Sequence, residues 1–334
     1  MDSKGRPIPG GYLRFEPIKG LATVQFNEYP DVDSSGSFRV DLYPGRWNVQ
    51  WNPSFSSNVY QDYEATDRTV EVSADHSTLE WIVDGIVVQG GVKDPSGATV
   101  DSFGVYATNA RYEARASTTS GHYELYLAPG TYAFHAFGQY GSGLPSQSFG
   151  QISVQNDTTL DFQFDGIEIT GTVRGPGSVP LVAAAVQARG ETNGAVALSD
   201  ASGNYRMYLP PQDVRFRISP AETWILQQLT TSTAIAGPAQ IDFNLGATEW
   251  TGTVTRSDTA APVADAKVTA FLVADALERR ATATTDASGQ FRLAVEPGRE
   301  YDLLAVTDSM QSAKVSRVAG ADSSFALEII VPGP

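Results

Sequence analysis

The chain has 334 residues, a formal net charge of −15 and no cysteine. Without thiols it can hold neither disulfides nor thiolate metal sites, and its acidity disfavours binding to nucleic acids and to anionic lipid. No run of 18 apolar residues occurs, so we expect no membrane insertion by a helix, and a signal peptide is absent from this sequence.

One motif recurs four times along the chain. It consists of Ser-Gly, one further residue, an aromatic residue, an alternating run and a proline eight residues after the glycine. The glycines are Gly36, Gly121, Gly203 and Gly289, which gives a period of about 84 residues. Repetition at a fixed period indicates an array of similar structural units. The four copies span 35–45, 120–130, 202–211 and 288–298.

The motif predicts two strands joined by tight turns. Ser-Gly closes a hairpin because glycine accepts positive φ, and Pro-Gly forms the next turn. Gln212 stands where this second glycine is expected in the third copy, so we expect a different turn there. Apolar residues alternate with polar ones in both strands and should face one core. The inward set of the first strand is Phe38, Val40, Leu42; Tyr123, Leu125, Leu127; Tyr205, Met207, Leu209; Phe291, Leu293, Val295. That of the second is Trp47, Val49, Trp51; Tyr132, Phe134, Ala136; Val214, Phe216, Ile218; Tyr301, Leu303, Ala305.

Each copy also has an opening and a closing strand. Opening strands start at 86, 167 and 248, and each has a glycine in its interior, which marks a bulge or a close backbone approach. Closing strands lie at 79–83, 160–164, 241–245 and 325–331. About seven short strands in about 80 residues, without helical periodicity, indicate a small antiparallel sandwich. The predicted fold is all-β, with four tandem seven-stranded antiparallel β-sandwich repeats at 1–84, 85–165, 166–245 and 246–334.

The links between the predicted repeats are very short. Residues 84–85, 165–166 and 245–246 leave one or two positions between neighbouring sandwiches. Short links restrict motion, so we expect an elongated, semi-rigid rod of roughly 120 Å.

The fourth copy carries the most complete set of family motifs. It contains Gly252-Thr253-Val254, Ala266-Lys267-Val268, the run 285–291 (Thr-Asp-Ala-Ser-Gly-Gln-Phe) and Pro297-Gly298. This layout, present less fully in the other copies, resembles the carboxypeptidase regulatory-like domain, a transthyretin-like (prealbumin-like) sandwich with an Ig-like fold. Such modules accompany carboxypeptidases, bacterial adhesins, outer-membrane receptors and surface stalks. The resemblance therefore implies a fold without fixing a function.

The first repeat lacks the opening strand that the other three possess. Its turn Asp2–Gly5 aligns with Asp94–Gly97, and no strand precedes it in the sequence. An empty strand position beside an apolar core is an open edge, which proteins normally cover or pair.

Three interpretations of this gap remain open. The chain is a fragment of a longer repeat protein, or the first repeat is a cap that is complete with fewer strands. In the third, a strand from another subunit fills the position, and a head-to-tail contact of this kind that does not close produces a filament. The candidate donor is the long apolar C-terminal segment with Phe325, Leu327, Ile329 and Val331, although the fourth repeat needs the same segment as its own last strand.

Residues that carry chemistry are sparse. His76, His122 and His135 have no metal-ligand spacing, and no catalytic motif occurs, so we expect no enzyme activity, no cofactor and no metal. The stretch 31–36 weakly resembles a calcium loop but fits a side-chain-capped turn better. Lys93 with Asp161 or Asp165 is the one arrangement that suits an isopeptide crosslink between first and last strands.

Aromatic residues outside the alternating pattern are the best candidates for binding. Trp47 and Trp51 share the inward parity and are expected in the core. Tyr60, Tyr63, Phe137 and Tyr140 lie in predicted loops, where they could stack on sugars or pack against a neighbouring repeat or subunit.

These observations predict a non-enzymatic structural protein outside a bacterial cell. The expected role is a subunit of a cell-surface filament or stalk, with self-association or contacts to other surface proteins as its partners. The alternative is a carbohydrate-binding adhesin or an accessory region of a larger secreted enzyme.

Overall fold

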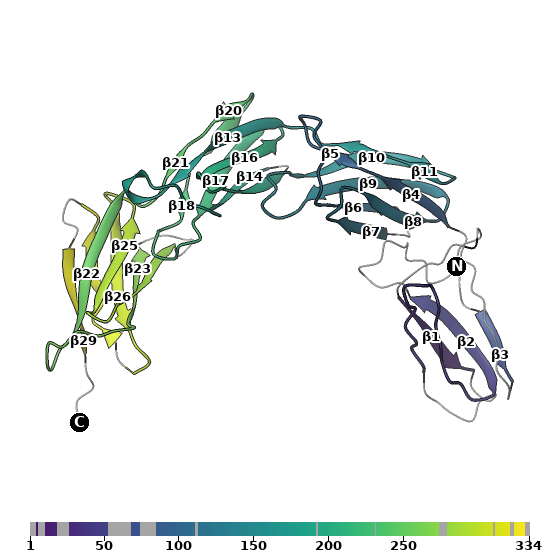
Figure 1. Cartoon of the computed structure of the whole chain (residues 1–334), viewed down its shortest axis with the longest axis horizontal. Coiled ribbons are helices and arrows are strands. Elements are labelled where there is room, and N and C mark those ends of the chain that lie inside the picture. The colour runs from purple at the N-terminus through teal and green to yellow at the C-terminus, as the bar shows by residue number, and fades with distance from the viewer. Residues whose placement is uncertain are drawn as a thin grey trace. The chain divides into compact units, whose positions relative to one another are not determined.

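The structure is a computed structural model, and it describes residues 5, 11–18, 27–52, 68–73, 85–110, 113–191, 193–230, 232–273, 279–309, 311–320 and 324–330. Strands dominate this part of the chain (Figure 1). Within it, the helical structure is confined to the three-residue 3-10 turn Pro176–Ser178. The all-β prediction is confirmed.

The chain forms two compact units. One consists of residues 1–139 and 146–164, and the other of residues 140–145 and 165–334. We use the names repeat 1 to repeat 4 for the predicted ranges 1–84, 85–165, 166–245 and 246–334. Pairings between the described strands fall inside these ranges, while the division into four repeats stays a prediction.

Repeat 2 is a sandwich of two sheets. The larger has the order β10-β9-β6-β7, and across from it β4 pairs with β8 and β11, while β5 pairs with β12. β4 and β5 form one opening strand interrupted at Gly91, as the interior glycine predicted. The bounds are β4 Ile86–Gly90, β5 Val92–Lys93, β6 Phe103–Thr108, β7 Glu113–Thr118, β8 Tyr123–Leu127, β9 Gly130–Gly138, β10 Ser146–Val154, β11 Thr158–Thr159 and β12 Phe162–Gln163.

Repeat 3 repeats this plan. One sheet has the order β15-β14-β17-β18, with β19 also on β17, and the other places β13 between β16 and β20, with β21 also on β13. The bounds are β13 Ile167–Arg174, β14 Ala185–Gly190, β15 Gly194–Leu198, β16 Asn204–Leu209, β17 Gln212–Ser219, β18 Gln228–Leu229, β19 Thr233–Ile235, β20 Ala239–Gln240 and β21 Phe243–Asn244.

Repeat 4 joins its strands into one continuous sheet that folds over its core. The order is β24-β23-β26-β27-β29-β22-β25, and β28 also pairs with β26. β29 runs parallel to β22. The bounds are β22 Thr248–Arg256, β23 Lys267–Leu272, β24 Arg280–Thr284, β25 Gln290–Val295, β26 Glu300–Val306, β27 Gln311–Ser312, β28 Val315–Val318 and β29 Ser324–Ile330.

Repeat 1 shows a single sheet of the order β1-β2-β3, with bounds Tyr12–Pro17, Gly45–Asn52 and Arg68–Val72. β1 and β2 are antiparallel and place Leu13 opposite Trp51 and Phe15 opposite Val49. Trp47 and Trp51 are buried, as their parity predicted.

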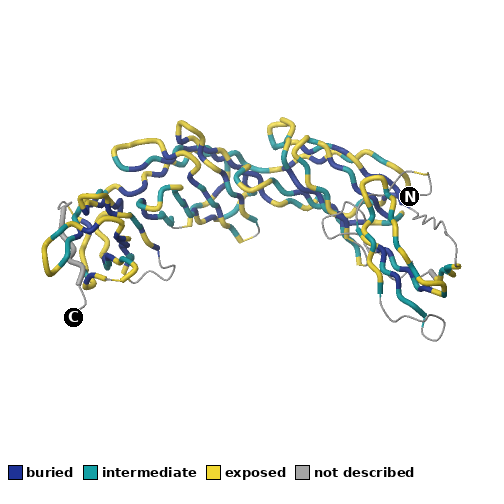
Figure 2. The backbone as a smooth tube through the Cα atoms, turned by 60° about the horizontal axis from the view of Figure 1, so that its bottom comes forward, coloured by how far each residue is buried: buried dark blue, intermediate teal, exposed yellow. Residues whose placement is uncertain are grey.

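The alternation places the apolar residues in the cores. Figure 2 shows buried residues along the strands and exposed ones at the turns. In repeats 2 to 4, the predicted inward residues of both motif strands are at most 5 % exposed. This burial of alternate side chains holds together the two sheets of repeats 2 and 3 and the folded sheet of repeat 4.

The Asp residues of the recurrent turns cap the turn, as the alternative to a calcium loop predicted. In Asp33, Asp94, Asp200 and Asp286, Oδ1 accepts backbone N–H groups two and four residues later, at 2.8–3.0 Å. These bonds satisfy the carboxylate inside the turn. Among the described residues no group of three metal-ligating side chains occurs.

Protonation of these carboxylates should weaken the turns. The hydroxyl of Ser288 and the backbone N–H groups of Gln290 and Ser288 lower the pKa of Asp286 below its usual 3.8. A lowered folded-state pKa gives stability that is complete above the unfolded value and is lost as the pH falls through the folded value. We therefore expect Asp286→Asn to show a shallower fall in Tm than the native chain below about pH 4. Thermal unfolding followed by circular dichroism across this range checks the slope, and identical slopes would contradict it.

Candidate functional site

In repeats 2 to 4 the first motif strand always pairs with an opening strand. β8 pairs with β4, β16 with β13 and β25 with β22, each antiparallel and in the same register. The amides of Tyr208 and Ala294 point away from their opening strands, because they donate to Gly143 O and Trp224 O. By alternation, the amides one residue before and one after them face the opening strand.

Repeat 1 has the corresponding segment without a strand partner among the described residues. Residues 37–43 form no strand, although their alternation predicted one at Phe38, Val40 and Leu42. The prediction of a strand at these residues was wrong, because a β-strand is defined by its backbone hydrogen bonds to a neighbouring strand. The amides of these three residues occupy the places whose counterparts bond to β4, β13 and β22.

The side chains of residues 38–42 are also incompletely buried, at the positions that lack a strand partner. Phe38, Val40 and Leu42 are only half-buried. Their counterparts are almost completely enclosed: Leu125, Met207 and Leu293, which match Val40, are each 0 % exposed. The Phe38 ring still lies 6.1 Å from that of Phe15, which is a core residue. The segment thus faces the core, and within the described part of the chain no strand covers it. We call residues 38–42 the open slot of repeat 1.

In repeats 2 and 3 the residue that matches Phe38 is a tyrosine, and its hydroxyl donates to a backbone carbonyl of the closing strand. Tyr123 donates its hydroxyl to Leu160 O and Tyr205 donates to Ile241 O, both at 2.7 Å. Burial, and then the charge of Asp161 or Asp242, raises the pKa of these hydroxyls, so they remain donors. Phe38 has no hydroxyl, so repeat 1 cannot make this contact.

The candidate donor strand is engaged in its own repeat. β29 pairs with β22 on one edge and with β27 on the other. The segment that carries Phe325, Leu327 and Ile329 is therefore the last strand of repeat 4: β22 pairs with it over Ser324–Ile329, and β27 pairs with it at Ile329 and Ile330. Val331 lies outside the described residues.

The structure describes two of the four candidate ligand-contacting aromatics. Tyr60 and Tyr63 lie outside the described residues. Tyr140 is 75 % exposed and belongs to the second unit, whereas Phe137, half-buried, belongs to the first. Phe137 covers Gly104, where a Cβ atom would lie 2.2 Å from its ring. Of the two, Tyr140 alone presents an open ring.

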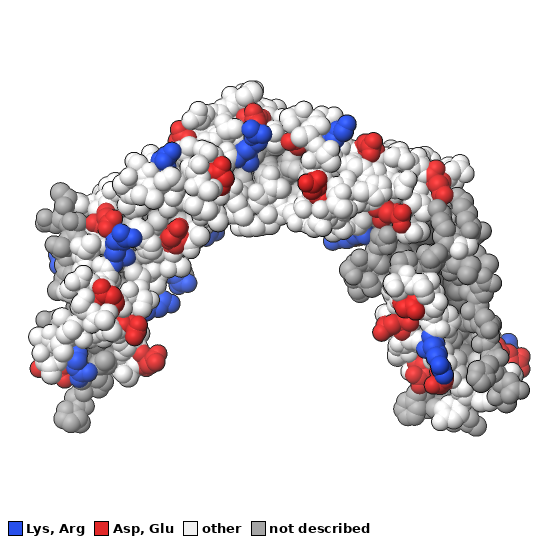
Figure 3. All heavy atoms as spheres, in the orientation of Figure 1, with Lys and Arg blue, Asp and Glu red and all other residues white. Residues whose placement is uncertain are grey.

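The candidate crosslink residues have other contacts. Asp161 accepts the N–H of Gly91 at 2.8 Å, and Asp242 accepts that of Thr172 in repeat 3 at the same distance. This shared bond ties each last strand to its opening strand. Lys93 pairs with Gln163 across β5 and β12, and a crosslink to Asp161 or Asp165 stays a prediction. On the face seen in Figure 3, acidic and basic side chains of the described residues are scattered among neutral ones, and in places a basic group lies beside an acidic one.

A second feature joins repeats 3 and 4 inside the second unit. The chain between β17 and β18 lies between the edges of β24 and β25. Thr282 N donates to Thr223 O and Ala294 N donates to Trp224 O, both at 2.8 Å, and Leu226 N donates to Ala294 O at 2.9 Å. Leu226 is 1 % exposed and packs in the core of repeat 4. Residues 140–145 bond to repeat 3 in a similar way, since Gly143 N donates to Val196 O and Gly143 O accepts from Tyr208 N.

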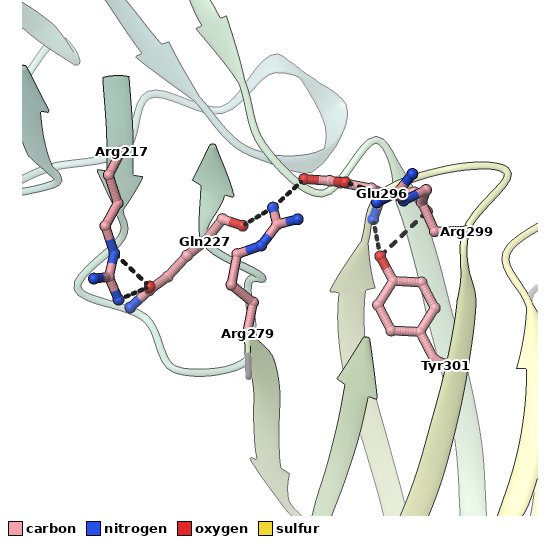
Figure 4. A network of polar contacts seen from close by, with 6 residues as sticks. All are labelled: Arg217, Gln227, Arg279, Glu296, Arg299 and Tyr301. Atoms are coloured by element: carbon pink, nitrogen blue, oxygen red, sulfur yellow. Dashed lines mark hydrogen bonds and ion pairs between the residues drawn. The ribbon is translucent and has the colours of Figure 1, made fainter. Parts of the chain in front are cut away.

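Arg279 fixes this junction (Figure 4). Its Nη1 donates to Gln227 O at 3.3 Å and to Glu296 Oε1 at 2.9 Å, while Arg217 holds the Gln227 side chain. The Arg279 side chain is 7 % exposed.

A threonine-rich groove of about 880 Å³ lies nearby and is lined by Trp224 and Arg292. The Arg292 guanidinium lies over the Trp224 ring, 4.1 Å from its centroid. That ring face is therefore occupied and unsuited to stacking on a sugar.

Arg279→Ala should loosen the junction between repeats 3 and 4. Removing one partner of a largely buried ion pair costs about 3 kcal/mol. Here Glu296 loses its closer cation, with Arg299 left at 4.0 Å, and the Gln227 carbonyl loses its donor. Arg280→Ala, which alters the exposed neighbour, serves as the control. Urea unfolding of both variants checks the difference, and equal midpoints would contradict the role of Arg279.

Residues 251–329 match the model of the carboxypeptidase regulatory-like domain. This segment of repeat 4 is therefore similar to that family, as the sequence predicted. No curated protein matches the chain.

Solved structures that are similar to this chain include the shaft pilin SpaA from Lactobacillus rhamnosus GG, with 13 % identity and a TM-score of 0.26; the match covers 51 % of this chain and 99 % of that chain. The Bacillus anthracis TIE protein has 11 % identity and a TM-score of 0.23, and the match covers 97 % of this chain and 69 % of that chain. A streptococcal ancillary pilin has 9 % identity and a TM-score of 0.26, and the match covers 73 % of this chain and 99 % of that chain. Similarity at this level carries no functional argument. Among the described residues, no helix is long and apolar enough to cross a membrane.

Proposed function

We propose that this protein is a non-catalytic structural subunit of an extracellular filament or stalk. In this proposal a strand of a neighbouring copy fills the open slot of repeat 1. The observation that carries it is the half-burial of Phe38, Val40 and Leu42, whose counterparts in the other repeats are covered by an opening strand. Added strands of this kind gain both main-chain hydrogen bonds and apolar contacts.

The junctions support a structural role as well. Backbone hydrogen bonds and the bond from Arg279 Nη1 to Gln227 O join repeats 3 and 4 directly, so force applied to one is carried to the next. A protein that spaces or bridges other molecules depends on such junctions more than on a ligand-binding cleft.

Size-exclusion chromatography with light scattering and negative-stain electron microscopy test the proposal. We expect oligomers or filaments of the native chain that are lost in Val40→Asp, because a charge in the slot cannot be covered by a strand. Val182→Asp makes the same change at a valine that is 48 % exposed and should assemble normally. A native chain that stays monomeric, or a Val40→Asp chain that assembles, would contradict the proposal.

Tyr140→Ala separates the carbohydrate-binding alternative from assembly. This variant should assemble like the native chain, because Tyr140 lies far from the slot in sequence and belongs to the other unit. Loss of binding on a glycan array with assembly intact would favour the adhesin interpretation. Unchanged assembly with no glycan binding by either chain would favour the structural one.

A further inference from the structure

We propose that the open slot of repeat 1 selects a strand with a fixed pattern, supplied by a second polypeptide chain. The pattern is a β-branched residue at the first position, an apolar residue at the third and glycine at the fifth. The strand runs antiparallel to residues 38–42. The inference rests on the proposed function in one respect, since both use the open slot. It specifies which side chains the added strand must carry, and it does not require that the chain forms a filament.

Three strands of this chain already occupy the equivalent slots. Position one of each faces Leu127, Leu209 or Val295, and position five faces Tyr123, Tyr205 or Phe291. Aligned on the glycines of the motif, these places correspond to Leu42 and Phe38, with Val40 opposite position three. The opening strands therefore serve as templates for the missing one.

The inward positions of the templates define the first two requirements. Position one is Ile86, Ile167 or Thr248, all β-branched, a side-chain type that suits a strand. Position three is Val88, Ile169 or Trp250, and each is at most 1 % exposed. A polar residue there would be buried without a partner.

In repeats 2 and 3, glycine at position five is required by the closing strand. A Cβ atom on Gly90 would lie 2.0 Å from Leu160 O, and one on Gly171 would lie 1.8 Å from Ile241 O. Repeat 4 has Gly252 at the same position. No side chain fits where a backbone carbonyl approaches so closely.

The pattern specifies no residue at the second position, because the neighbouring charges of repeat 1 would act on it in opposite directions. In repeat 3 Glu168 pairs with Arg206 at 3.0 Å, and Arg39 takes the place of Arg206 in repeat 1. However, Asp41 would lie directly opposite this position and would repel a glutamate. The neutral Val87 of repeat 2 avoids the conflict, so residues 86–93 are the best probe.

Fluorescence anisotropy with a labelled peptide of residues 86–93 tests the inference on the full chain at a concentration where it is monomeric. We expect saturable binding that weakens at least about tenfold when the peptide carries Gly90→Val or Val88→Asp. The same loss is expected when the native peptide meets the Val40→Asp chain, whereas the Val182→Asp chain should bind normally.

The outcomes separate this inference from the proposed function. No binding to the native chain, or equal binding of the Gly90→Val peptide, would overturn the inference even if filaments form. Binding with the expected pattern by a chain that never assembles would support the inference and contradict the polymer. Binding that survives Val40→Asp would place the peptide elsewhere and overturn the inference.

Discussion

Joining residues 86–93 directly ahead of Asp2 is expected to give a chain that no longer assembles and whose first repeat resists unfolding. In repeat 2 this strand leads into the turn Asp94–Gly97, and Asp2–Gly5 is the matching turn. Gly5 and Gly97 both have positive φ, at 78° and 88°, which agrees with the alignment. The added strand can therefore enter the slot in the register of β4. Covering the half-buried Phe38, Val40 and Leu42 should stabilise repeat 1 by about 2–4 kcal/mol.

Light scattering and urea unfolding followed by tryptophan fluorescence measure the two effects. Trp47 and Trp51 lie in the core of repeat 1 and report on its unfolding. The same fusion with Val88→Asp is the matched control, since it adds equal length but buries a charge. A fusion that assembles as the native chain does, or a control that behaves like the fusion, would count against the open slot.

Gly171→Ala is expected to destabilise repeat 3 by about 3 kcal/mol or more. The added Cβ would lie 1.8 Å from Ile241 O and 2.8 Å from the Tyr205 ring. Strand β13 would have to move away from the closing strand, which would disturb the bond from Tyr205 to Ile241 and the core beneath it.

Gly237→Ala is the control for this variant, because the same methyl group there has no atom within 4 Å. Urea unfolding of both variants and of the native chain gives the comparison. If Gly171→Ala unfolds at the native midpoint, the glycine is not required by the packing of opening and closing strands, and the basis for the donor pattern is lost.

The sandwiches could be predicted from the sequence because their physics is local. Alternation with a period of two determines which side chains face inward, and Gly and Pro mark the turns between strands. Tyr132, Phe134 and Ala136 illustrate this, since each is 0 % exposed as expected. The turn function of Asp286 was equally readable, because its bonds reach only two to four residues away.

Features that depend on distant partners could not be predicted in this way. The alternation at residues 38–42 indicated a strand, but strand pairing needs a second segment that the pattern of one segment does not supply. The junction around Trp224 and Arg279 was missed because its members come from two repeats. Leu226, between β17 and β18, is 1 % exposed and packs in the core of repeat 4, a contact that the pattern of its own repeat does not indicate.

Amide hydrogen exchange of the monomeric chain tests the central claim most directly. The amides of Phe38, Val40 and Leu42 should exchange at least about a hundredfold faster than those of Tyr205, Met207 and Leu209, because only the latter bond to an opening strand. Adding the peptide of residues 86–93 should slow the first group and leave the second unchanged. Equal protection of the two groups in the monomer without peptide would show that the slot is already filled and would contradict the account.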